Sequence, residues 1–183
     1  SSDVCSSDLP SDRLRVRLTE RHPQYARGAI VEILEPGEGR REPPCPLFEV
    51  CGGCDLQQIE DRFQGRLKVA AAREALRRIG KLESLPDSRL LEGRPFHYRS
   101  RTQLQIREED GEVRVGYFAR GSHDLVDVER CPVLVPTLEA QLESVAGVLP
   151  PSPPVRLDLA VGDDDEITCS PVVEGLPRGA IRR

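Results

Sequence analysis

The residues of this 183-residue chain that are best suited to chemistry are its cysteines. Three of them form a local C-x5-C-x2-C pattern, made by Cys45, Cys51 and Cys54. Gly52 and Gly53 lie between the last two, and small residues let neighbouring thiolates turn toward one centre without backbone strain. Three soft sulfur ligands in one loop indicate a metal site that needs a fourth ligand.

Two further cysteines compete for the fourth position. Cys131 follows a predicted strand and precedes Pro132, so the strand end can fix its side chain. Cys169 lies beyond a proline-rich linker, and we interpret it as an ordinary buried thiol. Cys5 lies in the opening residues 1–9, which are excluded below, and the five remaining cysteines are an odd number. No secretory signal opens the chain either, so a disulfide framework is disfavoured. Four thiolates suit tetrahedral zinc or an iron-sulfur cluster, and the lack of two close cysteine couples tilts the choice toward the cluster.

Alternating apolar and polar residues predict strands on both sides of the cysteine loop. The alternation from Leu14 to Leu34 indicates two or three half-buried strands. It returns from Tyr98 to Val128, where Asp110-Gly111 predicts a hairpin turn. The segments VRLDLAV and EITCSPV indicate two more strands, and residues 136–148 a short helix. The predicted fold class is therefore α+β, with an antiparallel sheet.

A helix is predicted from Asp61 to about Gly80, with Asp61 as its N-cap and the glycine closing its far end. Its apolar stripe consists of Val69, Ala72, Leu76 and Ile79. The neighbouring basic face consists of Arg62, Arg66, Arg73 and Arg77. Such a face is more often simply solvated, but it is a candidate for phosphate contacts.

Charge is segregated along the chain. The net charge of -5 argues against a protein that coats nucleic acid with its whole surface. Between Arg62 and Arg120, however, 14 Lys and Arg residues stand against 8 Asp and Glu residues, whereas the charged residues from Asp158 to Glu174 are all acidic. The middle of the chain is therefore the predicted docking place for a phosphate backbone.

Neither a membrane span nor a targeting signal is visible in the sequence. No apolar run of about 18 residues occurs, and no signal pattern opens the chain, so we expect a cytoplasmic protein without a membrane partner. Residues 1–9, SSDVCSSDL, resemble a translated sequencing adapter, and the sequence contains no methionine. We therefore expect a piece of a longer protein in which Cys5 has no function.

Tyr98, Arg99 and Arg101 are the predicted RNA contacts. Single-stranded RNA is held by charge and by base stacking on aromatic rings, which these residue types supply. The alternative, which stays equally open, is that Tyr98 packs in the core and the arginines pair with Glu108 or Glu109.

The segment CPLFEVCGGCDLQQI resembles the iron-sulfur motif of the bacterial 23S ribosomal RNA uracil-C5 methyltransferases. The resemblance extends over about Leu14 to Val161, and the strands before Cys45 resemble the last part of a TRAM domain, a small RNA-binding β-barrel. Its further matching residues are Gln64, Lys68, Tyr98, Arg99, Arg101, Gly116, Tyr117, Phe118, Cys131 and Pro132.

This resemblance implies a [4Fe-4S] cluster held by Cys45, Cys51, Cys54 and Cys131. It also implies an S-adenosylmethionine-dependent reaction, in which a cysteine thiolate adds to C6 of a uracil and a carboxylate base removes the C5 proton after methylation. The expected partner is 23S ribosomal RNA rather than DNA, and the expected state is a monomer. The catalytic Rossmann-like domain of that family is missing from this sequence, so no residue is assigned a catalytic role and the chain alone should be inactive.

The expected organisation has four parts after the excluded residues 1–9. They are a partial TRAM barrel at 10–42, a cluster loop at 43–60, a helix with an antiparallel-sheet central domain at 61–149, and a linker with strands at 150–183. The alternative function is a stand-alone RNA-binding module, with zinc or an iron-sulfur cluster and no catalysis. A radical-SAM methylthiotransferase would need C-x3-C-x2-C, and a ferredoxin-like carrier would need a fourth cysteine close by, so both are disfavoured.

Overall fold

The computed structural model describes residues 8–9, 11–145, 147, 149 and 155–172. The predictions made for Cys5, for residues 1–7 and for the linker at 150–154 therefore lie outside the described residues. The chain divides into a first unit, Ser1–Pro43 with Asp55–Gly93, and a second unit, Pro44–Cys54 with Arg94–Arg183. Each unit contains one antiparallel sheet, so the predicted α+β class is confirmed. The predicted domain boundaries stay predictions.

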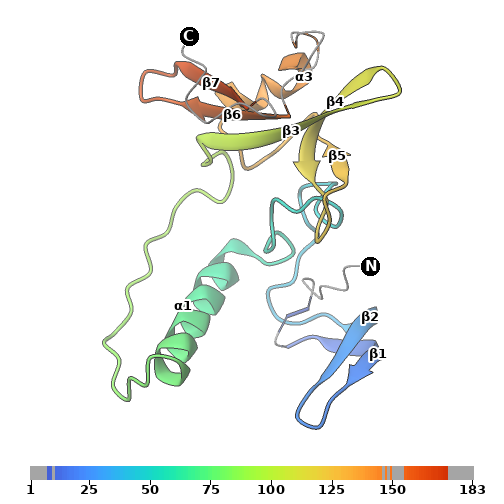
Figure 1. The fold of residues 1–183 in the computed structure, drawn as a ribbon. Helices are drawn as coiled ribbons and strands as arrows, with labels where there is room; N and C mark the ends of the chain where they lie inside the picture. The colour runs from blue at the N-terminus through green and yellow to red at the C-terminus, as the bar shows by residue number, and fades with distance from the viewer. Residues whose placement is uncertain (1–7, 10, 146, 148, 150–154, 173–183) are drawn as a thin grey trace. The chain divides into compact units, whose positions relative to one another are not determined.

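The sheet of the first unit has two strands, β1 (Arg13–Arg21) and β2 (Ala26–Glu35), which pair antiparallel with several irregularities of register (Figure 1). Strands in this region were predicted, and the prediction is confirmed. Apolar residues remain open to solvent here: Val16 is 49% exposed and Leu18 is 52% exposed. Among the described residues these strands form a two-stranded sheet and no closed barrel.

Helix α1 (Asp61–Arg78) also belongs to the first unit, and its ends differ from the prediction. The N-cap is Glu60, not Asp61, and no side-chain hydrogen bond caps the helix. Asp61 instead accepts hydrogen bonds from the guanidinium of Arg41. At the far end the left-handed residue is Lys81 rather than a glycine, and Leu82 N donates to Leu76 O at 3.2 Å.

The apolar stripe predicted for α1 is not buried. No described residue of the helix is buried, and Ile79 is 73% exposed. No helix in the described part of the chain is long and apolar enough to cross a membrane.

The second unit is built on a five-stranded antiparallel sheet in the order β5-β4-β3-β6-β7 (Figure 1). The strand bounds are Arg101–Glu109 for β3, Glu112–Phe118 for β4, Leu125–Asp127 for β5, Arg156–Val161 for β6 and Ile167–Val172 for β7. Asp110 and Gly111 join β3 to β4, and both have positive φ. A two-residue turn with this backbone conformation matches the twist of the two strands. The predicted hairpin is confirmed.

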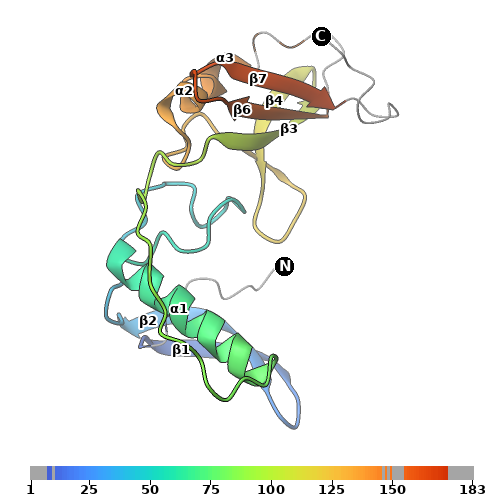
Figure 2. The same ribbon diagram turned by 90° about the vertical axis from the view of Figure 1, so that its left-hand side faces the viewer.

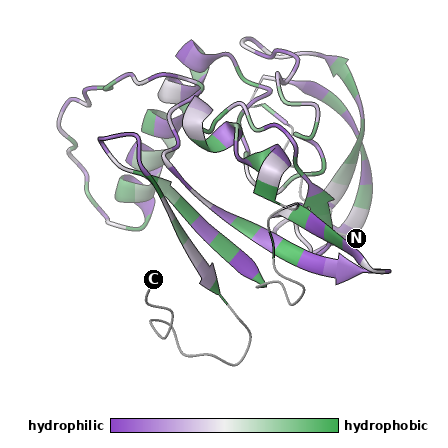
Figure 3. Cartoon of the chain, turned by 90° about the horizontal axis from the view of Figure 1, so that it is seen from above, coloured by the Kyte–Doolittle hydropathy of each residue, from purple (hydrophilic) through white to green (hydrophobic). Residues whose placement is uncertain are grey.

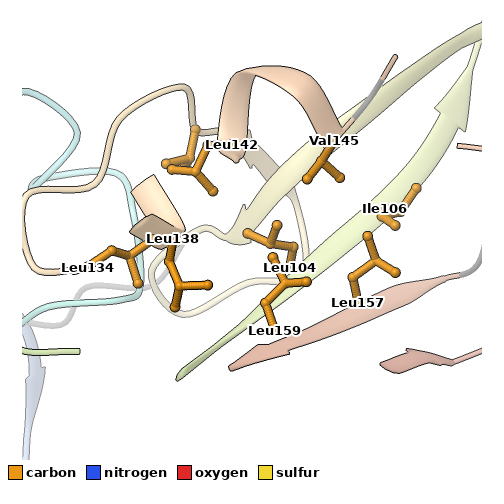
Figure 4. Close-up of a cluster of buried hydrophobic side chains, with 9 residues drawn as sticks. Leu104, Ile106, Leu134, Leu138, Leu142, Val145, Leu157 and Leu159 are labelled. Carbon is orange, nitrogen blue, oxygen red and sulfur yellow. The ribbon is translucent and has the colours of Figure 1, made fainter. Parts of the chain in front are cut away.

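One face of this sheet is covered by two short helices, α2 (Pro136–Glu139) and α3 (Leu142–Val145), where a single helix was predicted (Figure 2). Leu138 and Leu142 pack from the helices onto Leu104 and Leu159 of the strands (Figure 4). Leu104, Leu134 and Leu138 are the largest fully buried side chains among the described residues. This cluster is the core of the second unit.

The opposite face of the sheet is polar, because side chains alternate across a strand. Along β3, Thr102, Leu104 and Ile106 are buried, while Arg101 and Gln103, which alternate with them, are exposed. Figure 3 shows the same alternation as bands of hydrophilic and hydrophobic residues.

Cys169 was predicted to be buried, and that prediction is wrong. It lies on β7, which is an edge strand of the sheet, and its side chain is exposed. An edge strand has a neighbour on one side alone, so fewer of its side chains are covered.

The core position of Leu104 can be tested against its neighbour on the same strand. We expect Leu104→Ala to lower the free energy of unfolding by about 2–5 kcal/mol, because it leaves a cavity among packed leucines. Gln103→Ala, on the exposed face, should change it by less than about 0.5 kcal/mol. Urea denaturation followed by circular dichroism measures both, and equal effects would contradict the assigned face.

Candidate metal centre

The loop that carries three of the cysteines is pinned to the end of β4. Cys51 forms an isolated antiparallel bridge with Ala119. Gly52 N donates to Phe118 O at 2.9 Å, and Arg120 N donates to Val50 O at 2.8 Å. A Cβ atom at Gly52 would lie 3.0 Å from Phe118 O, so a larger residue would crowd this carbonyl and a glycine favours the close approach.

Cys131 reaches the same region from another part of the chain. It lies four residues after β5 in a tight turn, in which Leu134 N donates to Cys131 O at 3.0 Å. Its own amide donates to Glu139 Oε1 of α2 at 3.1 Å. The backbone around Cys131 is therefore fixed by the core helix as well as by the turn.

All four predicted metal ligands belong to the second unit, and all four are half-buried thiols that form no disulfide. Burial is the largest cause that raises the pKa of Cys45, Cys51 and Cys131 above that of an ordinary thiol. The charge of Cys54 adds to the rise in each of the three. Cys54 is thus the thiol whose charge acts on each of the other three.

The thiols lie near one another without forming a ready-made site for one ion. Among the described residues, no three His, Cys, Asp or Glu side chains stand close enough to hold a single metal ion. The donor set is nevertheless suited to a soft metal, because four thiolates are the usual ligands of structural zinc and of iron-sulfur clusters. The assignment of Cys45, Cys51, Cys54 and Cys131 as metal ligands therefore stays a prediction.

Two arginines brace this loop. The guanidinium of Arg120 donates to Cys54 O and, at 3.3 Å, to Phe48 O. The guanidinium of Arg99 donates to Gly53 O at 3.4 Å. The charge of Arg120 lowers the pKa of Cys51, and that of Arg99 lowers the pKa of Cys131, which partly offsets burial. The sequence had indicated Arg99 as an RNA contact and had not indicated Arg120, whose place depends on a long-range contact.

Tyr117 lies beside Cys131 and Arg99. Its hydroxyl is 2.6 Å from Thr102 Oγ1, and its pKa is raised, mainly because the ring is buried. The Cys131 thiol and the Arg99 guanidinium both act on this hydroxyl. A neutral tyrosine next to the thiol group can donate one hydrogen bond and accept another.

The other predicted RNA contacts have different surroundings. Tyr98 is 53% exposed, so the alternative that it packs in the core is wrong. Glu109, one of the two alternative partners for the arginines beside Glu108, pairs with Arg114 at 2.7 Å. Arg101 is exposed, and the structure gives it no hydrogen-bond or ion-pair partner among the described residues. Whether Tyr98, Arg99 and Arg101 bind RNA stays a prediction.

The basic face of α1 is partly engaged within the first unit. Arg62 pairs with Glu60 at 2.9 Å, and Arg66 lies over the ring of Phe63. Arg73 donates to Pro86 O at 2.8 Å and to Ser88 Oγ at 3.0 Å. Arg77 is exposed at the last turn, as the prediction requires for a phosphate contact.

Comparison with known proteins gives clear relatives. The chain is 39% identical over 143 residues to the 23S rRNA (uracil(1939)-C(5))-methyltransferase RlmD of Pectobacterium atrosepticum. The matched stretch covers 77% of the chain and 32% of that protein. The chain is also 37% identical over 149 residues to an uncharacterized RNA methyltransferase of Thermosynechococcus vestitus, a match that covers 81% of the chain and 33% of that protein. The chain belongs to this RNA methyltransferase family. No protein-family model matches it.

The family predicted from the cysteine motif is thus confirmed, and the match includes the candidate metal centre. A match over 149 of 183 residues leaves out about 34, so the stretch from Cys45 to Cys131 must fall inside it. The chain spans about a third of the length of these relatives.

The exposure of the thiols predicts the order in which they react. In metal-free, reduced protein carrying Cys5→Ser, we expect iodoacetamide to modify Cys169 first, because it is exposed while the other four thiols are half-buried. Partial burial also raises the pKa of Cys169, so its advantage comes from access of the reagent. The pKa values of Cys51 and Cys131 are raised, so their thiolate forms appear at a higher pH than that of an ordinary thiol. Their alkylation rates should therefore rise at a higher pH than the rate of an ordinary thiol does.

Timed labelling followed by peptide mass spectrometry measures these rates. In urea, where burial is lost, all five thiols should react at similar rates. Equal rates in the folded protein would contradict the described burial.

Proposed function

We propose that the chain is the RNA-binding and iron-sulfur portion of an S-adenosylmethionine-dependent 23S ribosomal RNA uracil-C5 methyltransferase. The observation that carries the proposal is the coincidence of two facts. The relatives that match most of the chain include proteins named for this activity, and the matched stretch contains four half-buried thiols, Cys45, Cys51, Cys54 and Cys131. Methyl transfer and cofactor binding would belong to parts of the parent protein outside these residues, so the chain alone would be inactive.

Cys45, Cys51, Cys54 and Cys131 would hold a [4Fe-4S] cluster in this proposal. Their sulfur atoms supply the donor type that such clusters use, and their neighbours Arg99 and Arg120 would offset part of the negative charge of four thiolates. The cluster would tie the loop at Cys45–Cys54 to the turn at Cys131 and would stabilise the fold. No redox step in methylation is assigned to it.

The first unit would contribute an RNA-binding surface. Its β1–β2 sheet leaves Val16 and Leu18 exposed, as strands of an incomplete barrel would, and this supports the TRAM-like assignment of residues 10–42. The partner would be 23S ribosomal RNA rather than DNA, and the protein would be a cytoplasmic monomer.

Metal analysis of paired variants tests the cluster. We expect anaerobically purified protein to contain about four irons and four sulfides per chain and to absorb visible light. Cys131→Ser should lose iron and lower the free energy of unfolding, because it removes one ligand. Cys169→Ser, a control that removes an exposed thiol, should keep the iron.

Either of two results would count against this assignment. One zinc and no colour would favour the stand-alone RNA-binding module. If Cys169→Ser lost its iron while Cys131→Ser kept it, the fourth ligand would be Cys169 rather than Cys131.

Arginine variants on the sheet test the RNA contact. We expect Arg101→Ala to weaken binding of a short single-stranded RNA by about three- to tenfold, and to reduce the slope of log K against log salt by about 0.7. Arg114→Ala is the matched control, because Arg114 is already paired with Glu109 and Asp127 on the same sheet.

Fluorescence anisotropy at several salt concentrations measures both variants. If they lose affinity equally, the RNA contact would be a general charge effect rather than a contact at Arg101.

A further inference from the structure

A pocket of about 620 Å³ lies on the second unit, among residues of β3, β4, β6 and β7 and of the segment just before β3. Its volume is in the range of small-molecule sites, about 300–1,000 Å³. None of the four candidate metal ligands lines this pocket. Most of its lining comes from the three neighbouring strands β3, β6 and β7.

The hollow arises from a row of side chains that crosses these strands. Arg101 of β3 is the cross-strand partner of Ala160 of β6, which in turn is the partner of Thr168 of β7. Cross-strand partners point to the same face of a sheet. The row therefore places the smallest side chain between a long cation and a hydroxyl, which leaves space above Ala160.

A second row lies beside the first and is polar throughout. Gln103 is the partner of Asp158, and Asp158 is the partner of Ser170. Arg156 holds Asp158 by an ion pair at 2.8 Å, yet a carboxylate has about four acceptor positions and keeps some of them open. The second row thus offers an amide, a carboxylate and a hydroxyl side by side.

Arg101 is the arginine of this face for which the described residues supply no carboxylate or carbonyl partner. Arg107 donates to His123 O, Arg114 pairs with two carboxylates, and Arg156 pairs with Asp158. Arg101 has no such partner there, and it lines the pocket with Arg99. The lining therefore combines excess positive charge with several neutral hydrogen-bonding groups.

We propose that this pocket holds one nucleotide of single-stranded RNA, with Arg101 on its phosphate and with Gln103, Asp158 and the hydroxyl groups on its ribose and base. An unpaired cation suits a phosphate, and amide, carboxylate and hydroxyl groups suit the polar edges of an unstacked nucleotide. Double-stranded RNA would be read across a wide groove rather than in one pocket. The proposal rests on the proposed RNA-binding function and adds the place where a nucleotide is held.

The decisive variant fills the pocket without changing its charge. We expect Ala160→Leu in the full chain to weaken binding of fluorescein-labelled hexauridylate by about tenfold or more, since it occupies the space above the first row. Thr168→Leu, at the exposed end of the same row, should act in the same direction. Gln105→Leu is the matched control, because Gln105 lies on the same face of β3 but does not line the pocket.

Titration of the wild-type chain with UMP gives an independent readout that needs no variant. The backbone amide signals of residues 158–160 and 168–170 should shift in nuclear magnetic resonance spectra. Uridine and inorganic phosphate should each bind more weakly than UMP. Melting curves of the variants show whether each one is folded.

The outcomes separate this proposal from the proposed function. If the wild type binds hexauridylate and the UMP-induced shifts lie elsewhere, or both filling variants bind as the wild type does, the pocket proposal is overturned and the RNA-binding function stands. If inorganic phosphate binds as tightly as UMP, the pocket is an anion site only and the nucleotide proposal is overturned. If the wild type binds neither hexauridylate nor UMP, both proposals are overturned.

Discussion

The arrangement of the candidate metal centre depends on the pairing between the cysteine loop and the backbone that follows β4. Gly52, Val50 and Cys51 meet Phe118, Arg120 and Ala119 through main-chain contacts. Main-chain hydrogen bonds of this kind hold the loop through its backbone, in addition to the contacts of its side chains. Since β4 is an inner strand, held on both sides by β5 and β3, the backbone to which the loop is bonded is itself held by the sheet.

The same geometry sets up an electrostatic conflict. Partial burial raises the pKa of the thiols at Cys45, Cys51 and Cys131, whereas a metal binds the thiolate form. Two guanidinium groups beside the thiols oppose this effect, although burial remains the larger cause. A bound metal would supply the remaining stabilisation, so metal binding and folding of this loop would be coupled.

Local pattern in the sequence was enough for the features that depend on neighbouring residues. The Asp110-Gly111 hairpin and the strands around it are of this kind, because turn chemistry and period-two alternation act over a few positions. The left-handed conformation of Lys81, just after α1, was missed, because the neighbouring Gly80 was the expected residue and a lysine with positive φ is uncommon. The exposure of Cys169 was missed for another reason: whether a strand lies at the edge of a sheet is decided by pairing across the whole chain.

The candidate sites show the same division. The cysteine motif is local and could be read from the sequence, and so could the family. The bracing role of Arg120 depends on a carbonyl of Cys54, 66 positions away. The pocket depends on the register of three strands, two of which are far from β3 in the sequence. Such contacts leave no periodic signal, so the structure was needed to find them.

Arg99 and Tyr117 link the two sites of the second unit. Both line the pocket, while Arg99 also donates to Gly53 O of the cysteine loop and the Tyr117 hydroxyl lies beside the Cys131 thiol. A substitution at either residue would therefore disturb both sites, and its effect could not be assigned to RNA or to metal. Arg120 contacts the loop without lining the pocket, and Ala160 lines the pocket without contacting the loop. The two proposed functions can therefore be tested separately, with variants of Arg120 for the loop and of Ala160 for the pocket.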